Sequence, residues 1–311
     1  MAACTDALIQ ILTHSFFSKM RYSDMRVAIV VVTHNRLEYT KKTIARLLED
    51  KNEEFDLYLW DNASDDNTPE YLKDGIDDPR VTEVFLSNEN AGQVGGMNYV
   101  WGKTKAELVG KLDNDCLVTP GWTRILAQAH KDVPRLGAVA CWHFFPQDFD
   151  YDLAKGKIQS FGEHRVFRHP WVGGTGFLMK RQTFLECGPW KGGADVGTTY
   201  YFLQMALRGY INGWYYPLVF QEHMDDPMSE HSMLKTDQSI EELHDVTYTL
   251  RNRDIRTMRE RLMWRDKVIK DLLCSPWEAK RHVGWRKKWQ RAQAKLRRLC
   301  GKAWFRSRLR V

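Results

Sequence analysis

Two aspartates separated by one residue give the clearest chemical signal in the sequence. Asp113 and Asp115 lie in the stretch KLDNDCLV, after the apolar run LVGKL, which predicts a buried strand. Residues i and i+2 of an extended chain point the same way, so both carboxylates can face one ligand. Adjacent carboxylates repel each other unless a cation lies between them. Mg²⁺ and Mn²⁺ prefer carboxylate, water and phosphate oxygens. The spacing therefore predicts a metal-diphosphate site. The alternative is that Asp113 caps a turn and Asp115 is merely solvated.

The elements before this motif alternate between strand and helix patterns. Residues 27–33, VAIVVVT, form a continuous β-branched run that is typical of a strand buried on both faces of a parallel sheet. Further strands are predicted up to residue 60, over 81–88 and into the Asp113 motif, with a helix after each of the first three. This alternation predicts an α/β fold with a mostly parallel sheet flanked by helices.

Polar clusters follow these strands at the positions where open α/β sheets bind ligands. They comprise residues 33–36, 61–62, 88–92 and 113–115. The carboxyl ends of parallel strands lie at one edge of a sheet. We therefore expect four separate segments to line one crevice.

Composition narrows the class of protein. The chain has 311 residues, 43% of them apolar, which suits one large domain or a domain with an appendage. Its six cysteines are scattered without a CxxC pair, a pattern typical of free thiols in a reducing compartment. No apolar run approaches the roughly 20 residues that span a bilayer, and the N-terminal segment does not resemble a secretory signal. We expect a cytoplasmic protein.

Residues 27 to about 223 resemble the nucleotide-sugar glycosyltransferases of the GT-A fold, specifically the large family 2 type. The resemblance rests on four motifs in the family's order: VAIVVVTHNR, DLYLWDNASDDNT, NENAGQVGGMNYV and LDNDCLVTPGW. Each motif alone is weak, but the ordered set is specific and covers roughly two thirds of the chain.

The resemblance implies a role for each matching residue. It places the end of the first strand at the nucleotide base, and Asp61 as an acceptor for the base or ribose, unless Asp61 only caps a turn. Asp115, with Asp113, would hold Mn²⁺ or Mg²⁺, and His223 would complete the metal site, with His231 as the alternative. The implied nucleotide-sugar-binding residues are Thr33, His34, Asn35, Arg36, Asp61, Asn90, Gly92, Asn98, Asp113, Asn114 and Gly174.

The general base matches the family least well. The stretch GGADVGTTYYFLQMALRGY contains ALRGY, which resembles the family's Arg-x-Gly-Tyr. However, Gly197 and Thr198 stand where the family has a Glu-Asp pair. Asp195 is the carboxylate expected to take the acceptor's proton. The alternatives are that Asp195 caps a helix, or that the base is Asp225, Asp226 or Glu163.

The acceptor side is expected in HPWVGGTGFLMKRQTFLECGPW, which resembles the family's acceptor segment. Gly173, Gly174 and Gly176 would let the backbone approach a sugar. Trp171 and Trp190 either stack on a pyranose ring or belong to the core.

A strong charge asymmetry separates the C-terminal tail from the rest of the chain. The net charge is +6, yet thirteen of the 46 basic residues lie in 280–311, which has no acidic residue. The remaining residues carry 33 basic and 40 acidic groups. Such a tail fits an anionic membrane surface, the phosphates of a nucleic acid, or packing on the catalytic domain. One apolar helical stripe is predicted at Trp285, Trp289, Ala292, Leu296, Leu299 and Ala303.

The predicted organisation is an N-terminal extension over 1–24, a GT-A domain over 25–228, a helical linker over 229–279 and a basic amphipathic tail over 280–311. The expected activity is metal-dependent, inverting transfer of a sugar from a UDP-, GDP- or dTDP-linked donor to an acceptor hydroxyl. We expect it in cell-envelope polysaccharide or glycolipid synthesis, peripherally on the inner face of the membrane. The alternatives are transfer to a modified nucleobase in DNA, as in some phage enzymes, and a non-catalytic nucleotide-sugar-binding protein.

Overall fold

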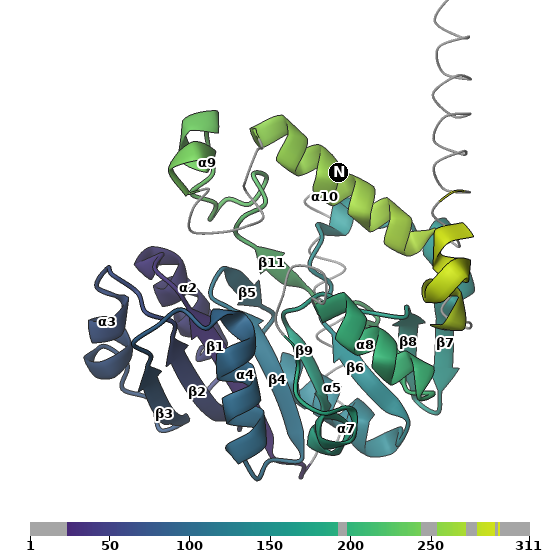
Figure 1. Cartoon of the computed structure of the whole chain (residues 1–311), viewed down its shortest axis with the longest axis horizontal. Helices are drawn as coiled ribbons and strands as arrows, with labels where there is room; N and C mark the ends of the chain where they lie inside the picture. The colour runs from purple at the N-terminus through teal and green to yellow at the C-terminus, as the bar shows by residue number, and fades with distance from the viewer. Residues whose placement is uncertain (1–23, 192–197, 244–253, 272–278, 290–291, 293–311) are drawn as a thin grey trace, which may run out of the picture.

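The computed structural model describes residues 24–191, 198–243, 254–271, 279–289 and 292. All seven residues of the first strand are buried, in agreement with its β-branched run. The predicted alternation of strand and helix is confirmed (Figure 1). Its elements are β1 (Val27–Thr33), α2 (Leu37–Leu47), β2 (Asp56–Asp61), α3 (Thr68–Asp74), β3 (Val81–Leu86), α4 (Gly92–Lys103) and β4 (Leu108–Asp113).

Within the described residues, a nine-stranded sheet forms the centre, in the order β3-β2-β1-β4-β9-β6-β10-β8-β7. The first four of these strands are parallel, as predicted. Beyond β4 the sheet is mixed, because β9 runs antiparallel to both of its neighbours and β8 pairs antiparallel with β10 and β7. The additional strands are β6 (Leu136–Ala140), β7 (Ile158–Phe161), β8 (His164–Arg168), β9 (Phe177–Lys180) and β10 (Ile211–Tyr216).

Helices cover both faces of the sheet, and alternate residues of β1 contact opposite layers. Ile29 and Val31 belong to the core cluster that includes residues of α2 and α5. Val30 and Val32 belong to the cluster that includes residues of α4 and α8. This two-sided burial explains why β1 reads as an unbroken apolar run. The further helices are α5 (Trp122–Asp132), η1 (Pro146–Asp148), α6 (Tyr151–Ala154), η2 (Lys155–Lys157), α7 (Arg181–Cys187) and α8 (Thr198–Leu207).

The register of the parallel strands brings the expected site residues to one edge. Thr33 at the end of β1 pairs with Asp61 at the end of β2. On the other side of β1, Val32 pairs with Asp113 at the end of β4. Three strand ends thus lie side by side, and the loops that follow them share this edge.

A separate two-stranded sheet extends this edge. It consists of β5 (Cys116–Val118) and β11 (Gln221–His223), which run antiparallel with His223 opposite Cys116. The pairing joins the segment that follows the two aspartates to a strand about a hundred residues later in the chain (Figure 1).

The described residues after β11 are mainly helical. They form α9 (Asp237–Leu243), α10 (Ile255–Lys270) and η4 (Ala279–His282). Asp254 caps α10 through a reciprocal pair of hydrogen bonds with Thr257. Arg259 of α10 forms ion pairs with Asp148 and Asp226, so α10 is attached to the sheet domain. No helix in the described part of the chain is both long and apolar enough to cross a membrane.

Candidate active site

Asp113 is paired with a lysine of its own strand. Lys111 and Asp113 are two residues apart on β4, so their side chains share a face, and they form an ion pair. The Lys111 side chain is fully buried, and its ammonium also donates to Gln93 Oε1 at 2.7 Å and to the Gly174 carbonyl at 3.0 Å. The charge of Asp113 is therefore compensated from within the protein, and Gly174 lies beside it.

Asp115 has a different partner. Arg36 Nη1 donates to Asp115 Oδ2 at 3.2 Å, and the same guanidinium forms an ion pair with Asp225. The Arg36 side chain is 5% exposed and the Asp225 side chain 1%. Asn35 and Arg36 both adopt the left-handed backbone conformation, with φ of 53° and 63°. Such conformations are costly for residues other than glycine and cluster at functional sites.

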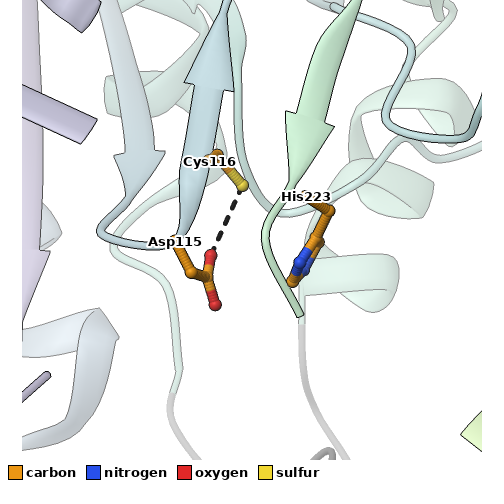
Figure 2. A group of neighbouring side chains, drawn as sticks. All are labelled: Asp115, Cys116 and His223. Carbon is orange, nitrogen blue, oxygen red and sulfur yellow. Dashed lines mark hydrogen bonds between the residues drawn. The ribbon is translucent and has the colours of Figure 1, made fainter. Parts of the chain in front are cut away.

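Two further side chains of types that can ligate a metal lie close to Asp115. Cys116 Sγ donates to Asp115 Oδ1 at 3.4 Å. His223 lies across the β5–β11 pair, and Figure 2 shows its ring beside the Asp115 carboxylate and the Cys116 thiol. Ligand atoms of these three residues all lie within 4.8 Å of one another. Among the described residues, these three form the cluster of His, Cys and Asp side chains that could hold a metal ion.

Burial and neighbouring charges separate the two aspartates electrostatically. Burial raises the pKa of Asp113 above its ordinary value, and Lys111 only partly opposes this. Burial acts in the same direction on Asp115, but the positive charges of His223 and Arg36 outweigh it and lower the pKa of Asp115. Burial would lower the pKa of His223, but the carboxylates of Asp115, Asp225 and Asp113 raise it. The pKa values of the two aspartates are thus shifted in opposite directions.

The ends of β1 and β2 are joined through Asp61. Its carboxylate accepts hydrogen bonds from the Thr33 hydroxyl at 3.2 Å and from the backbone N–H and hydroxyl of Ser64 at 3.0 and 2.5 Å. Asn35 donates its backbone N–H to Ser64 Oγ and accepts from the Asp65 N–H. Asp61 therefore organises the loop that follows β2 and connects it to the loop that follows β1. The nucleotide role of Asp61 remains a prediction.

The Asn- and Gly-rich segment NENAGQVGGMNYV also forms hydrogen bonds at this edge of the sheet. Asn90 Oδ1 accepts from Asn62 Nδ2 at 2.5 Å and from the Gly92 N–H at 3.0 Å. Asn98 lies deeper, where its amide exchanges two hydrogen bonds with the backbone of Trp190. Trp190 is 4% exposed and packs among aromatic rings, so it belongs to the core.

The remaining predicted residues lie at very different distances from the two aspartates. Asn114 donates from Nδ2 to Thr40 Oγ1 at 3.1 Å, which fixes the turn between Asp113 and Asp115. The buried Nδ1 of His34 has no hydrogen-bond partner within the described residues. His231 is bound to Glu222 at 3.0 Å. Glu163 lies in the turn between β7 and β8, which are the fifth and fourth strands away from β4 in the sheet. Asp195 lies outside the described residues.

Sequence reasoning missed two members of the site. Lys111 had a signal, since alternation along a strand puts residues 111 and 113 on one face. Cys116 had none, because its proximity to His223 depends on a pairing between distant segments. Arg36 bridges Asp115 and Asp225, and its role at the nucleotide base stays a prediction.

Comparisons with known proteins agree with this geometry. The family model for glycosyl transferase family 2 matches residues 28–187, just over half of the chain. The chain belongs to this family. A comparison of the sequence with curated proteins finds no match. As a family 2 glycosyltransferase, the protein has the expected α/β architecture of the GT-A fold.

A solved structure supports the fold of this family 2 glycosyltransferase. It is the mannosyltransferase PcManGT from Pyrobaculum calidifontis, in complex with GDP-Man and Mn²⁺. The two chains are 16% identical, and the similarity covers 93% of this chain and 87% of that chain with a TM-score of 0.54. At this identity the similarity shows the fold.

The residues present fit a divalent cation. Asp115 offers a carboxylate oxygen and His223 a ring nitrogen, and both ligand types are common for first-row divalent metals. The carboxylates of Asp115, Asp225 and Asp113 raise the pKa of His223 above its ordinary value.

Proposed function

We propose that this glycosyltransferase moves a sugar from a nucleotide-diphosphate donor to an acceptor hydroxyl with the help of a divalent cation. The observation that carries the proposal is the group Asp115, Cys116 and His223, whose ligand atoms lie within 4.8 Å at the edge where β1, β2 and β4 end. A bound cation would neutralise the negative charge that develops on the departing diphosphate.

The protein's own groups hold this arrangement in place. Arg36 fixes one oxygen of Asp115 and connects it to Asp225. Lys111 compensates Asp113, which leaves Asp113 free to accept a hydrogen bond from a ribose or sugar hydroxyl. The loop organised by Asp61 and Ser64, together with Thr33, His34, Asn35, Asn90 and Gly92, would receive the nucleotide.

Asp195 is proposed as the general base of a single, inverting displacement. Two of the alternative carboxylates are already engaged: Asp225 is paired with Arg36, and Asp226 with Arg259. A base must be free to take the acceptor's proton. These engagements therefore favour a carboxylate outside both ion pairs.

The nature of the donor is proposed from the neighbouring structure. PcManGT was solved with GDP-Man and Mn²⁺, so GDP-linked sugars head the set of donors to test, followed by UDP- and dTDP-linked sugars. Mn²⁺ is the first metal to test, with Mg²⁺ as the second.

The experiment screens nucleotide sugars by thermal shift with Mn²⁺ or with a chelator, followed by donor turnover. We expect one donor class to raise the melting temperature only when Mn²⁺ is present, because a ligand that binds the native state stabilises it. The matched variants are Asp115→Ala and the exposed Asp152→Ala. Turnover that is the same with a chelator, or unaffected by Asp115→Ala, would disprove the metal role.

We also propose that the start of the basic tail contacts an anionic membrane surface, where a glycolipid acceptor would be available. Trp285 and Trp289 are 72% and 62% exposed, and Arg286 stacks on Trp285 with 5.5 Å between its guanidinium and the ring centroid. Interfacial helices combine such aromatic groups with basic residues. We expect the double variant Trp285→Ala/Trp289→Ala to lose flotation with phosphatidylserine vesicles. Binding to DNA in place of vesicles would favour the nucleobase acceptor.

A further inference from the structure

The Cys116 thiol lies next to the proposed metal position. Its Sγ is 3.4 Å from Asp115 Oδ1, and the strand register puts Cys116 directly opposite His223. Figure 2 shows the thiol pointing toward the Asp115 carboxylate, with the His223 ring beside them. Sulfur, oxygen and nitrogen ligands therefore surround one point from three residues.

Neighbouring ion pairs decide which atoms are left for a cation. Arg36 already holds Asp115 Oδ2, so the oxygen left for a cation is Oδ1, which accepts the hydrogen bond of the Cys116 thiol. Asp113 is paired with the fully buried Lys111 and does not belong to the three-residue group. An ion that enters beside Asp115 Oδ1 thus meets Sγ and an imidazole nitrogen.

We propose that Cys116 is a third protein ligand, so that the centre binds thiophilic divalent cations such as Co²⁺, Zn²⁺ and Cd²⁺. This inference rests on the proposed metal site and specifies its ligands. In the metal-free protein the thiol donates its hydrogen to Asp115. On ligation the cation takes the place of this hydrogen, and the proton leaves to solvent. Thiolate and imidazole ligands suit these cations, whereas a site built from oxygen alone suits Mg²⁺ or Mn²⁺.

Charge is balanced in this arrangement. A divalent cation is matched by the Asp115 carboxylate and the Cys116 thiolate, while His223 binds as the neutral imidazole. Arg36 and Asp225 form a neutral pair behind Asp115. Positions not occupied by the protein remain for water or for diphosphate oxygens.

Cys141 provides a matched control. Both thiols are completely buried and belong to the same core cluster. Within the described residues Cys141 is not a member of any group that could hold a metal. A serine at either position removes one buried sulfur, but only Cys116→Ser removes a proposed ligand.

The experiment titrates the metal-free full chain with Co²⁺ and records the near-ultraviolet band of charge transfer from thiolate to cobalt. We expect the band in the unsubstituted protein and in Cys141→Ser, and its loss in Cys116→Ser. In Cys116→Ser, the affinity for Cd²⁺ should fall at least about tenfold relative to that for Mn²⁺, because thiolate ligands favour the softer ion. Calorimetry measures both affinities, and circular dichroism confirms that each variant is folded.

Two negative outcomes are distinguishable. Cobalt that binds in an Asp115-dependent way without the charge-transfer band would overturn the role of Cys116 and leave the proposed metal site intact. Absence of binding by Co²⁺ and Mn²⁺ alike, with or without a nucleoside diphosphate, would overturn the metal site itself. If Cys116→Ser fails to fold, loss of the band in Asp115→Ala, with the band retained in Cys141→Ser, assigns it to this centre, and a band that survives Asp115→Ala would overturn the proposal.

Discussion

The two aspartates of one short motif occupy contrasting surroundings. Asp113, at the end of β4, is neutralised by Lys111 of the same strand, and burial raises its pKa. Asp115, two residues later, lies between Arg36 and His223, whose charges lower its pKa. The first carboxylate is part of a local ion pair. The Asp115 carboxylate connects the segment between β4 and β5 with Arg36, early in the chain, and lies close to His223, late in the domain.

This contrast shows that the residue types of a motif do not determine the role of each residue in it. Spacing places both carboxylates at one strand end. The partners of each carboxylate determine which one can bind an ion. Asp113 is paired with Lys111 of its own strand, whereas the partners of Asp115 are Arg36, 79 positions earlier in the chain, and His223, 108 positions later. We therefore expect substitutions at the two positions to have unequal effects.

The largest effect is expected on activity. We expect Asp115→Asn to reduce sugar transfer about a thousandfold, because it removes the ionised ligand that positions a charge-neutralising cation. We expect Asp113→Asn to reduce it only about tenfold, since an amide still forms hydrogen bonds to a hydroxyl. Initial rates at saturating metal, with the surface variant Asp152→Asn as the control, measure this difference. Equal losses of activity in Asp113→Asn and Asp115→Asn would show that the two aspartates do not have different roles.

An intermediate effect is expected on stability. Lys111→Met leaves the Asp113 carboxylate without its countercharge, and breaking such a pair costs about 3 kcal/mol of unfolding free energy. Adding Asp113→Asn to Lys111→Met should restore most of this loss. Urea unfolding measures both variants.

The exposed pair Lys103–Glu83 is the matched control for Lys111–Asp113. Lys103→Met should cost less than about 1 kcal/mol, because surface ion pairs contribute little. A Lys111→Met variant that is no less stable than Lys103→Met would show that Asp113 does not depend on its lysine.

The smallest effect is expected in the dependence of stability on pH, measured with a chelator present. The pKa of Asp113 lies above its ordinary value of 3.8. The folded state therefore takes up this proton at a higher pH than the unfolded state does. As the pH falls toward the ordinary aspartate range, the free energy of unfolding of the unsubstituted protein should rise relative to that of Asp113→Asn. The pKa of Asp115 lies below 3.8, so the effect of Asp115→Asn should stay constant over the same fall in pH. If the stability of Asp113→Asn and of Asp115→Asn changed with pH in the same way, the opposite directions of the two pKa shifts would be contradicted.

The first half of the fold was predictable because its signals are local. The run VAIVVVT became β1 with the predicted bounds, and the alternation through β4 is confirmed. The second half was harder, because β9 enters antiparallel between β4 and β6. An apolar strand buried on both faces reads the same in either direction, so the sequence does not reveal this reversal.

The candidate site likewise has residues that local sequence signals predict and residues that depend on contacts between distant segments. Asp113 and Asp115 at the end of a strand followed from the pattern and from the resemblance, and His223 was named as a ligand from the resemblance alone. The proximity of Cys116 to His223 could not be inferred, since it depends on the β5–β11 register. The engagement of Arg36 with Asp225 depends likewise on two residues 189 positions apart.

The small β5–β11 sheet has a consequence for dissecting the protein. The segment that matches the family model ends at residue 187, whereas His223 and Asp225 lie beyond that boundary. An excised fragment or a chimera built to the family limits would retain Asp115 and Arg36 but separate them from both of these counterparts. Capture of a cation by the centre would then report that the two distant halves of the polypeptide have come together.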